Sequence, residues 1–456
     1  MKIIGWLVIF LLGLSIINLV AYRIKVIAKI GFSFPMGMGI NSFIMFSLDL
    51  FNIPINQINL ILGIETIIIL LSLTGFYLIN KSTITKGSFF TKIDFKKAFN
   101  INLAWIFLFS YAIYLVYVIT AKAMFWPPFI FDSIDGYDFL AKVIVKEGTL
   151  NNSIFNPDYL LSSIRSLYPP LVPLNFAFAY LLGFDSSQIV VALFFVSLFI
   201  SFYAMLTKHT TPLAGALFSL LLIITPEFAA FSCLSSSNPP CTFYCGIGMI
   251  CLYTYYHFKE KPYLYIGILF IMLAIWTRTE AVLFTVAGSL YLITKPFHKK
   301  QLLSLVLFGF CSMVAFLSWQ IYMKSVLNIE SSLPIVKKLF WDPEKLSRMW
   351  SQVTFVTFST QFYGIIVYLF ILMALANIVF IIKKKENGIL LGTILLAWVT
   401  YIYFYYQIDA DYVDLSMGGW IHSGYKRGLF YFLPLILFYC ANNFISDKLF
   451  KKYFTV

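Results

Sequence analysis

The sequence predicts an all-α polytopic membrane protein, a single domain over residues 1–456 with about thirteen transmembrane helices. The residues are 60% hydrophobic and only 12% charged, whereas a soluble domain is about 25% charged. Many apolar runs approach the roughly 20 residues that cross a bilayer core. The net charge of +13 comes largely from Lys and Arg in short connections between these runs. That pattern is typical of cytoplasmic loops and argues against a nucleic-acid surface.

The N-terminal part of the chain contains four expected spans, at residues 3–20, 31–51, 57–79 and 101–122. The connections after the first and third spans are rich in Lys and Arg and are predicted to be cytoplasmic, including residues 80–98. The connection FNIPINQ has neither Lys nor Arg and is predicted to be external. The N-terminus is therefore expected outside, and the fourth span leads to a large external loop at residues 123–170. Glycines 37 and 39 in the second span suggest close helix packing.

After this loop, residues 171–184 are too short to cross a roughly 30 Å core and predict a partial or surface-lying helix. Residues 263–294 carry WTRTE in their middle and have basic connections at both ends. Two cytoplasmic ends require an even number of crossings, so we expect two short helices joined at residues 277–280. The other spans are expected at residues 186–206, 212–231, 238–257, 302–323, 361–382, 388–407 and 428–445. Smaller external loops are expected at 325–360 and 408–427, and a cytoplasmic C-terminus follows.

The loop at residues 123–170 is the longest polar interval, and it contains Asp132, Asp135 and Asp138 at a spacing of three. If this segment is helical, neighbouring carboxylates share one face. Their repulsion raises a pKa toward the range of a general base, and their oxygens are suited to a divalent cation. The alternative is an acidic, solvated loop surface. Two segments of the loop, DFLAKVIVKEG and YLLSSIRSL, have the apolar spacing of short amphipathic helices.

Arg278 and Glu280 lie in the middle of an apolar stretch. Ionisable groups at membrane depth are costly and usually face an interior cavity or a partner. The two residues therefore predict either an arginine that faces a substrate or a mutual ion pair that closes the helix hairpin.

A second basic group begins the last span, where IHSGYKRG contains His422, Lys426 and Arg427. Cations at this external position suit an anionic headgroup, because Arg and Lys form charge-assisted hydrogen bonds with phosphate oxygens. The alternative is that these long side chains reach the membrane interface without binding a ligand.

Taken in chain order, these features resemble the C-type (GT-C) membrane glycosyltransferases, which include the bacterial protein O-mannosyltransferases and the lipid A aminoarabinose transferase. In that family an Asp follows an external helix end, as Asp132 does here. A small residue and a Lys lie a turn or two beyond it, similar to Ala141 and Lys142, and Tyr-Pro-Pro at Tyr168 opens the next apolar helix. The hairpin with a basic tip is similar to Ala274–Glu280, and a final helix headed by Arg and containing Pro is similar to Arg427–Pro434. Relatives have an aromatic-rich segment where this chain has two further carboxylates, so the resemblance leaves open which Asp is the base.

The resemblance implies transfer of a sugar from a polyprenyl-phosphate donor to a glycan, lipid or protein acceptor, at the outer face of the bacterial cytoplasmic membrane. Asp132 would be the base of an inverting displacement. The residues expected to bind substrate are Asp135, Asp138, Lys142, Tyr168, Arg278, Glu280, His422, Lys426 and Arg427. No cofactor and no metal ligand set are expected, although a divalent metal is not excluded. The alternatives are a lipid-linked-sugar flippase or transporter, for which repeat symmetry would be expected, and an O-antigen-type polymerase or ligase that relies on Arg and His.

Overall fold

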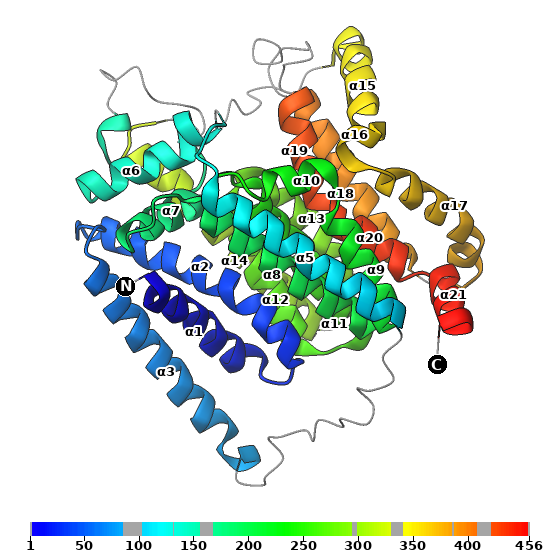
Figure 1. Cartoon of the computed structure of the whole chain (residues 1–456), viewed down its shortest axis with the longest axis horizontal. Coiled ribbons are helices and arrows are strands. Elements are labelled where there is room, and N and C mark those ends of the chain that lie inside the picture. The colour runs from blue at the N-terminus through cyan, green and yellow to red at the C-terminus, as the bar shows by residue number, and fades with distance from the viewer. Residues whose placement is uncertain are drawn as a thin grey trace.

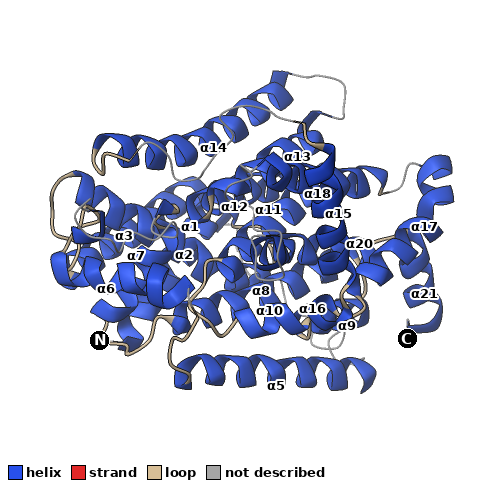
Figure 2. Cartoon of the chain, turned by 90° about the horizontal axis from the view of Figure 1, so that it is seen from above, coloured by secondary structure: helices blue, strands red, loops and turns tan. Residues whose placement is uncertain are grey.

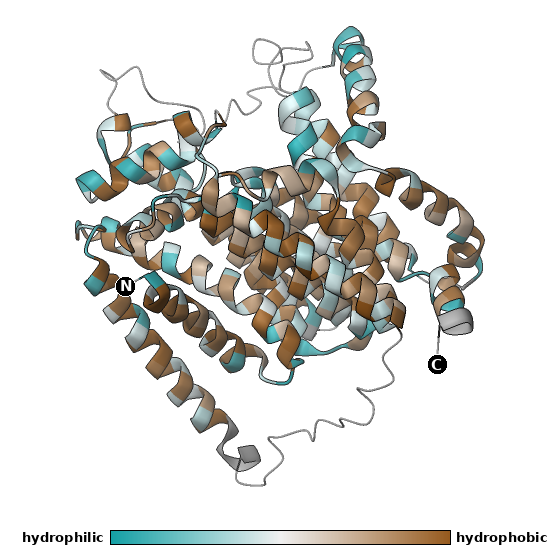
Figure 3. Cartoon of the chain, viewed as in Figure 1, coloured by the Kyte–Doolittle hydropathy of each residue, from teal (hydrophilic) through white to brown (hydrophobic). Residues whose placement is uncertain are grey.

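The computed structural model describes residues 2–84, 103–130, 132–155, 167–293, 299–329, 341–384, 387–407 and 421–454. All regular elements within these ranges are helices, so the predicted all-α class is confirmed. Figure 1 shows most of them as one bundle, with α6 (Asp138–Glu147) and α15 (Pro343–Phe358) outside it. These two helices carry many hydrophilic residues, whereas the bundle is mainly hydrophobic (Figure 3).

Eight described helices are long and apolar enough to cross a membrane. They are α1 (Lys2–Ala21), α2 (Val26–Leu50), α3 (Ile58–Ile84), α5 (Leu103–Phe125), α8 (Gln188–His209), α14 (Lys299–Ser325), α17 (Ile366–Lys384) and α18 (Gly388–Gln407). The bent pair that ends in α20 (Leu433–Ala441) and α21 (Phe444–Phe454) brings the number to nine if it forms one span. The chain thus has the helices of a multi-pass membrane protein, while the count of about thirteen stays a prediction.

The central helices are covered on opposite sides by α5 and α14, as Figure 2 shows. Helix α8 is mostly buried, whereas α3, α5 and α14 expose much of their apolar surface. Exposed apolar helices are costly in water but not in lipid, which agrees with lipid as the main solvent of this chain.

Helices α1 and α2 pack with their backbones in close approach, as the glycines of the second span suggest. A Cβ atom on Gly37 would overlap the carbonyl oxygen of Ile9, and one on Gly13 would overlap the carbonyl oxygen of Ser33. Only a residue without a side chain fits at such a crossing.

The run at residues 263–294 forms two short helices, as predicted. Helix α12 (Lys261–Thr277) ends before Arg278, whose backbone is extended, with φ −152° and ψ 130°. A short 3₁₀ turn, η4 (Thr279–Ala281), then leads into α13 (Val282–Ile293). This break turns two charged side chains inward instead of leaving them along a continuous apolar helix.

One expected element differs from the prediction, and a second agrees with only one of its two alternatives. The span at 212–231 is divided into α9 (Pro212–Ile223) and α10 (Pro226–Phe231), because proline at the start of α10 lacks the N–H that a continuous helix would use. Helix α7 (Leu171–Leu181) is short, as expected, but it does not lie on the surface. Its residues Leu171–Ala179 are buried, and Asn175 bonds to Asn41 of α2 at 2.9 Å. The helix has no polar face to turn to solvent.

The connections gather at the two ends of the bundle. At one end, Nε2 of His209 is 2.9 Å from the Thr254 hydroxyl, and Tyr253 donates to Asn387 at 2.5 Å. His209 and Asn387 belong to connections predicted to be cytoplasmic, and Tyr253 and Thr254 lie at the end of the span expected at 238–257, next to another such connection. Connections predicted to be external meet at the other end, where Arg278 bonds to Ser237 and Tyr168. The grouping agrees with the predicted alternation, and the membrane side that each end faces stays a prediction.

Candidate active site at one end of the helix bundle

Asp132 and Arg427 form an ion pair between the first polar loop and the last apolar helix. Asp132 precedes η1 (Ser133–Tyr137), and Arg427 lies in α19 (Lys426–Gly428), which follows η6 (Ile421–Tyr425). The two side chains are 10% and 18% exposed. The Nε atom of Arg427 also donates to the carbonyl oxygen of Ser423 at 2.8 Å, which orients the guanidinium toward the carboxylate.

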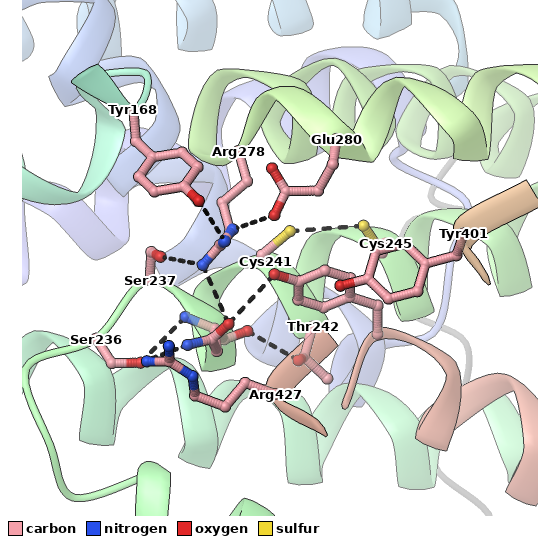
Figure 4. A network of polar contacts seen from close by, with 12 residues as sticks. Tyr168, Ser236, Ser237, Cys241, Thr242, Cys245, Arg278, Glu280, Tyr401 and Arg427 are labelled. Atoms are coloured by element: carbon pink, nitrogen blue, oxygen red, sulfur yellow. Dashed lines mark hydrogen bonds and ion pairs between the residues drawn. The ribbon is translucent and has the colours of Figure 1, made fainter. Parts of the chain in front are cut away.

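Arg278 is the centre of a second polar network, drawn in Figure 4. Its Nε donates to Glu280 at 2.5 Å, and its Nη2 donates to the Tyr168 hydroxyl at 3.0 Å. Its Nη1 donates to Ser237 at 3.1 Å and to Asn238 at 3.2 Å. The mutual Arg–Glu pair that the sequence allowed is therefore present. Among the described residues, these bonds use four of the five N–H groups of the guanidinium.

The two networks meet at the tyrosines of the first polar loop. Burial raises the pKa of Tyr168 above its usual value, and the charges of Arg278, Glu280, Arg427 and Asp132 all act on the hydroxyl. Charged groups of both networks therefore act on one side chain, and Arg278 contacts it directly. Because the hydroxyl stays neutral near pH 7, it can accept from Arg278 and still donate its own proton.

Tyr137 joins the same cluster from η1. Its ring centroid is 6.2 Å from that of Tyr168, and its hydroxyl accepts from Ser237 at 2.8 Å. Burial raises the pKa of Tyr137 as well, so its hydroxyl is neutral. The loop that carries the predicted base is thus attached to the segment that holds Arg278.

Asp138 and Lys142 form a separate group. Asp138 is buried, accepts from Tyr180 at 2.5 Å and from Ser187, and pairs with Lys142 at 2.8 Å. Ser187 in turn is 2.7 Å from the hydroxyl of Ser235. The expectation that Asp138 and Lys142 bind substrate directly stays a prediction. Their contacts hold α6, α7 and the serine loop, residues 232–238, together.

The condition for neighbouring carboxylates to share one face, a continuous helix, is not met between Asp135 and Asp138. The backbone kinks at Gly136 (φ −136°, ψ −111°), inside η1, so helical spacing does not continue from Asp135 to Asp138. Asp135 is half-buried in η1. Within the described ranges, no three His, Cys, Asp or Glu side chains form a group that could hold a metal ion.

The remaining basic residues of the last span lie beside the ion pair. Lys426 pairs with Glu227 of α10, and its Nζ is 4.5 Å from the ring centroid of Phe362. His422 packs against Phe362 and Phe355, with ring centroids 5.7 Å and 6.3 Å away. Both side chains are half-buried against other residues, and so neither simply extends into water.

The sequence singled out Glu280 and Tyr168 but not three other residues near Arg278. Ser237, Asn238 and Tyr431 surround the guanidinium, and Tyr431 donates to Asn238 at 3.2 Å. The run SSSNPP was a usable signal, because a polar run between apolar helices rarely lies within a core without partners. Tyr431 carried no such signal, since tyrosine is common in apolar helices.

In comparisons with protein-family models, curated proteins and solved structures, none matches this chain.

Proposed function

We propose that the chain is a C-type membrane glycosyltransferase that moves a sugar from a polyprenyl-phosphate donor to a hydroxyl group of a cell-envelope glycan, lipid or protein. The observation that carries this proposal is the Asp132–Arg427 ion pair beside the Arg278 network. It brings a carboxylate and two guanidiniums together at one end of helices apolar enough to cross a membrane. The reaction needs such a base for the acceptor and such cations for the lipid phosphate.

In this proposal the end of the bundle with Asp132 faces the outside of a bacterial cytoplasmic membrane. The loops at 123–170, 325–360 and 408–427 are external, and the shorter helices complete about thirteen crossings. The Lys and Arg distribution supports this orientation. Parts of all three loops, residues 156–166, 330–340 and 408–420, lie outside the described part of the chain, and so does most of the predicted helix YLLSSIRSL.

The reaction is a single displacement at the anomeric carbon. The acceptor oxygen forms a bond to this carbon, and Asp132 takes the hydroxyl proton. The bond from the same carbon to the phosphate oxygen breaks, and its electron pair stays on the lipid phosphate. Attack from the side opposite the leaving group inverts the anomeric configuration.

Arg427 stabilises the phosphate as its charge grows, which is where a fixed cation contributes most to rate. In the structure this guanidinium is occupied by Asp132. A donor phosphate would compete for its N–H groups and leave the carboxylate free to accept a proton. Asp132 would therefore act as a base mainly after the donor has bound, which limits side reactions in the empty enzyme.

Lys426 and His422 lie next to Arg427 and extend the basic surface toward the headgroup. Asp138 and Lys142 support the loop in this proposal and do not touch substrate. Asp135 is half-buried in η1, beside the base, and is assigned to the acceptor side.

The deciding experiment uses the purified chain in proteoliposomes with undecaprenyl-phosphate-linked mannose, glucose, galactose or arabinose. A glycosyltransferase releases undecaprenyl phosphate only when an acceptor is present, and Asp132→Asn abolishes this release. Envelope glycans and glycolipids from a deletion strain, analysed by mass spectrometry, identify the acceptor as the species that loses one sugar. Movement of intact donor across the bilayer without cleavage would instead favour a flippase.

A further inference from the structure

Glu280 has one carboxylate oxygen that is buried without a hydrogen-bond partner among the described residues. Its Oε1 accepts from Nε of Arg278, whereas Oε2 has none, and the side chain is 5% exposed. A buried acceptor without a donor costs about 1–3 kcal/mol, more when it is charged, and such atoms are rare in folded proteins. An orphaned acceptor inside a polar network therefore indicates a place for a group supplied from outside the chain.

The surroundings of Glu280 are rich in tyrosine. Its charge acts on the hydroxyls of Tyr168, Tyr401, Tyr405 and Tyr431. Figure 4 shows Glu280 and Tyr168 on the two sides of Arg278, with Tyr401 close by. Aromatic rings with polar edges beside a carboxylate are suited to a sugar, which presents C–H groups to rings and hydroxyl groups to acceptors.

The unpartnered oxygen also defines the chemistry of what it can bind. An ionised carboxylate only accepts hydrogen bonds, and Arg278 already balances its charge. The missing partner is therefore a donor such as a hydroxyl group, or a protonated amine on an amino sugar. A phosphate is excluded at this atom, because two anions would repel each other.

We propose that Glu280 is a specificity-determining residue whose Oε2 accepts a hydrogen bond from a hydroxyl or ammonium group on the transferred sugar. This inference rests on the proposed function. Arg427 faces the phosphate of the donor, and Glu280 faces its sugar. A site built to bond a substrate hydroxyl strongly rejects the analogue that lacks it, because its own buried group stays unpaired. The enzyme then rejects the matching deoxy sugar and the bare lipid phosphate.

The test compares the binding of two kinds of lipid to the full-length chain in detergent. One is undecaprenyl phosphate, and the others are undecaprenyl-phosphate-linked mannose, glucose, galactose and arabinose. The wild type should bind at least one sugar-bearing lipid more tightly than undecaprenyl phosphate. Glu280→Gln keeps an acceptor for Arg278 but places an amide N–H₂ at the free oxygen. In this variant the ratio of the affinity for the sugar-bearing lipid to that for undecaprenyl phosphate should fall by about 10- to 100-fold, as expected for a hydrogen bond to a charged group. Binding of undecaprenyl phosphate should not change.

Glu227→Gln is the matched control, since Glu227 also pairs with a cation, Lys426, at this end of the bundle. It should keep the preference. A second measurement needs no variant: in the wild type, one monodeoxy form of the preferred sugar should lose the same 10- to 100-fold.

Equal weakening of both kinds of lipid by Glu280→Gln would overturn the proposal, because it would mean that Glu280 only positions Arg278. Equal tolerance of every monodeoxy donor would overturn it too. In either case sugar transfer by the wild type would leave the proposed function standing. If the wild type neither transfers sugar nor distinguishes the lipids, both proposals are wrong.

Discussion

Asp132 and Arg427 lie 295 positions apart in the sequence and form one ion pair. The pair connects the first polar loop to the start of the last apolar helix, so it fixes the site as well as contributing charge. Removal of one partner from a largely buried pair costs about 3–5 kcal/mol, because the other charge stays uncompensated. Variants at either position must therefore be compared with controls that report on folding.

The orientation in the membrane can be tested with two engineered cysteines. Asn151 lies in the loop predicted to be external, and Lys261 lies at the predicted cytoplasmic end; both are exposed. In intact cells an impermeant maleimide should label Asn151→Cys and leave Lys261→Cys unlabelled until the membrane is permeabilised. Background labelling should be low, because five of the six native cysteines are buried and Cys311 is half-buried. If only Lys261→Cys were labelled in intact cells, the orientation in the membrane would be the opposite of the predicted one.

Gly428 should not tolerate a side chain. A Cβ atom there would overlap the Tyr401 hydroxyl, and that ring is buried against those of Tyr405, Tyr425 and Tyr431. Gly428→Ala should lower stability by about 1–3 kcal/mol, as overpacking of a filled core does. The control is Gly392→Ala in α18, where a Cβ meets nothing within 4 Å. Thermal unfolding in detergent measures both variants, and equal midpoints would show that the Tyr401 ring can move aside.

Glu65 in α3 should be dispensable for folding. Its side chain is fully buried, and neither oxygen has a hydrogen-bond partner within the described ranges. Replacement by leucine removes an unsatisfied group, so Glu65→Leu should gain about 1–3 kcal/mol of stability. The contrasting variant, Glu280→Leu, should lose stability because Arg278 is left buried and unpaired. A lower thermal midpoint for Glu65→Leu would mean that this carboxylate binds something outside the chain.

The sequence predicted those features that local pattern determines. Long apolar runs predicted the helices, and the charged centre of one run predicted the break before Arg278. The functional significance of Asp132 and Arg427 was predicted from their place at helix ends, although their direct contact was not. Tertiary packing decided what the sequence could not show. The regular spacing of the three carboxylates did not distinguish one from another. In the structure, the kink at Gly136 separates Asp138 from Asp132. The serine loop binds Arg278 through Ser237 and Asn238, and this contact depends on tertiary packing that the sequence does not show.

Both arginines should be needed for use of the lipid donor. Arg427→Ala and Arg278→Ala remove guanidiniums from the polar cluster and should weaken donor binding and transfer. Lysine should restore only part of the loss, because it lacks the planar fork that binds a phosphate through two N–H groups. Arg348→Ala is the control, since Arg348 is exposed on α15 and pairs at the surface with Glu344. Normal transfer by both alanine variants, at normal membrane levels, would rule out this assignment.

Asp132 should be the residue on which turnover depends. Asp132→Asn keeps the size of the side chain and removes its basicity, so turnover should fall by about 10²- to 10⁴-fold, the usual contribution of a general base. Donor binding should be kept or become tighter, because Arg427 no longer has a carboxylate competing with the phosphate. Asp138→Asn should lower the thermal unfolding midpoint, since Asp138 bonds to Tyr180, Ser187 and Lys142. The folded variant should keep most of its turnover.

Asp135→Asn decides between the two carboxylates that the family resemblance left open, and it should reduce turnover only mildly. If Asp132→Asn keeps more than about a tenth of wild-type turnover, which is too small a loss for a general base, while Asp135→Asn abolishes it, the base is Asp135. The Asp132–Arg427 pair would then be structural. If all three asparagine variants stay active, Asp132, Asp135 and Asp138 are each excluded as the base, and the assignment of the base to this cluster fails. The proposed displacement would fail with it, because no other step takes the proton from the acceptor hydroxyl.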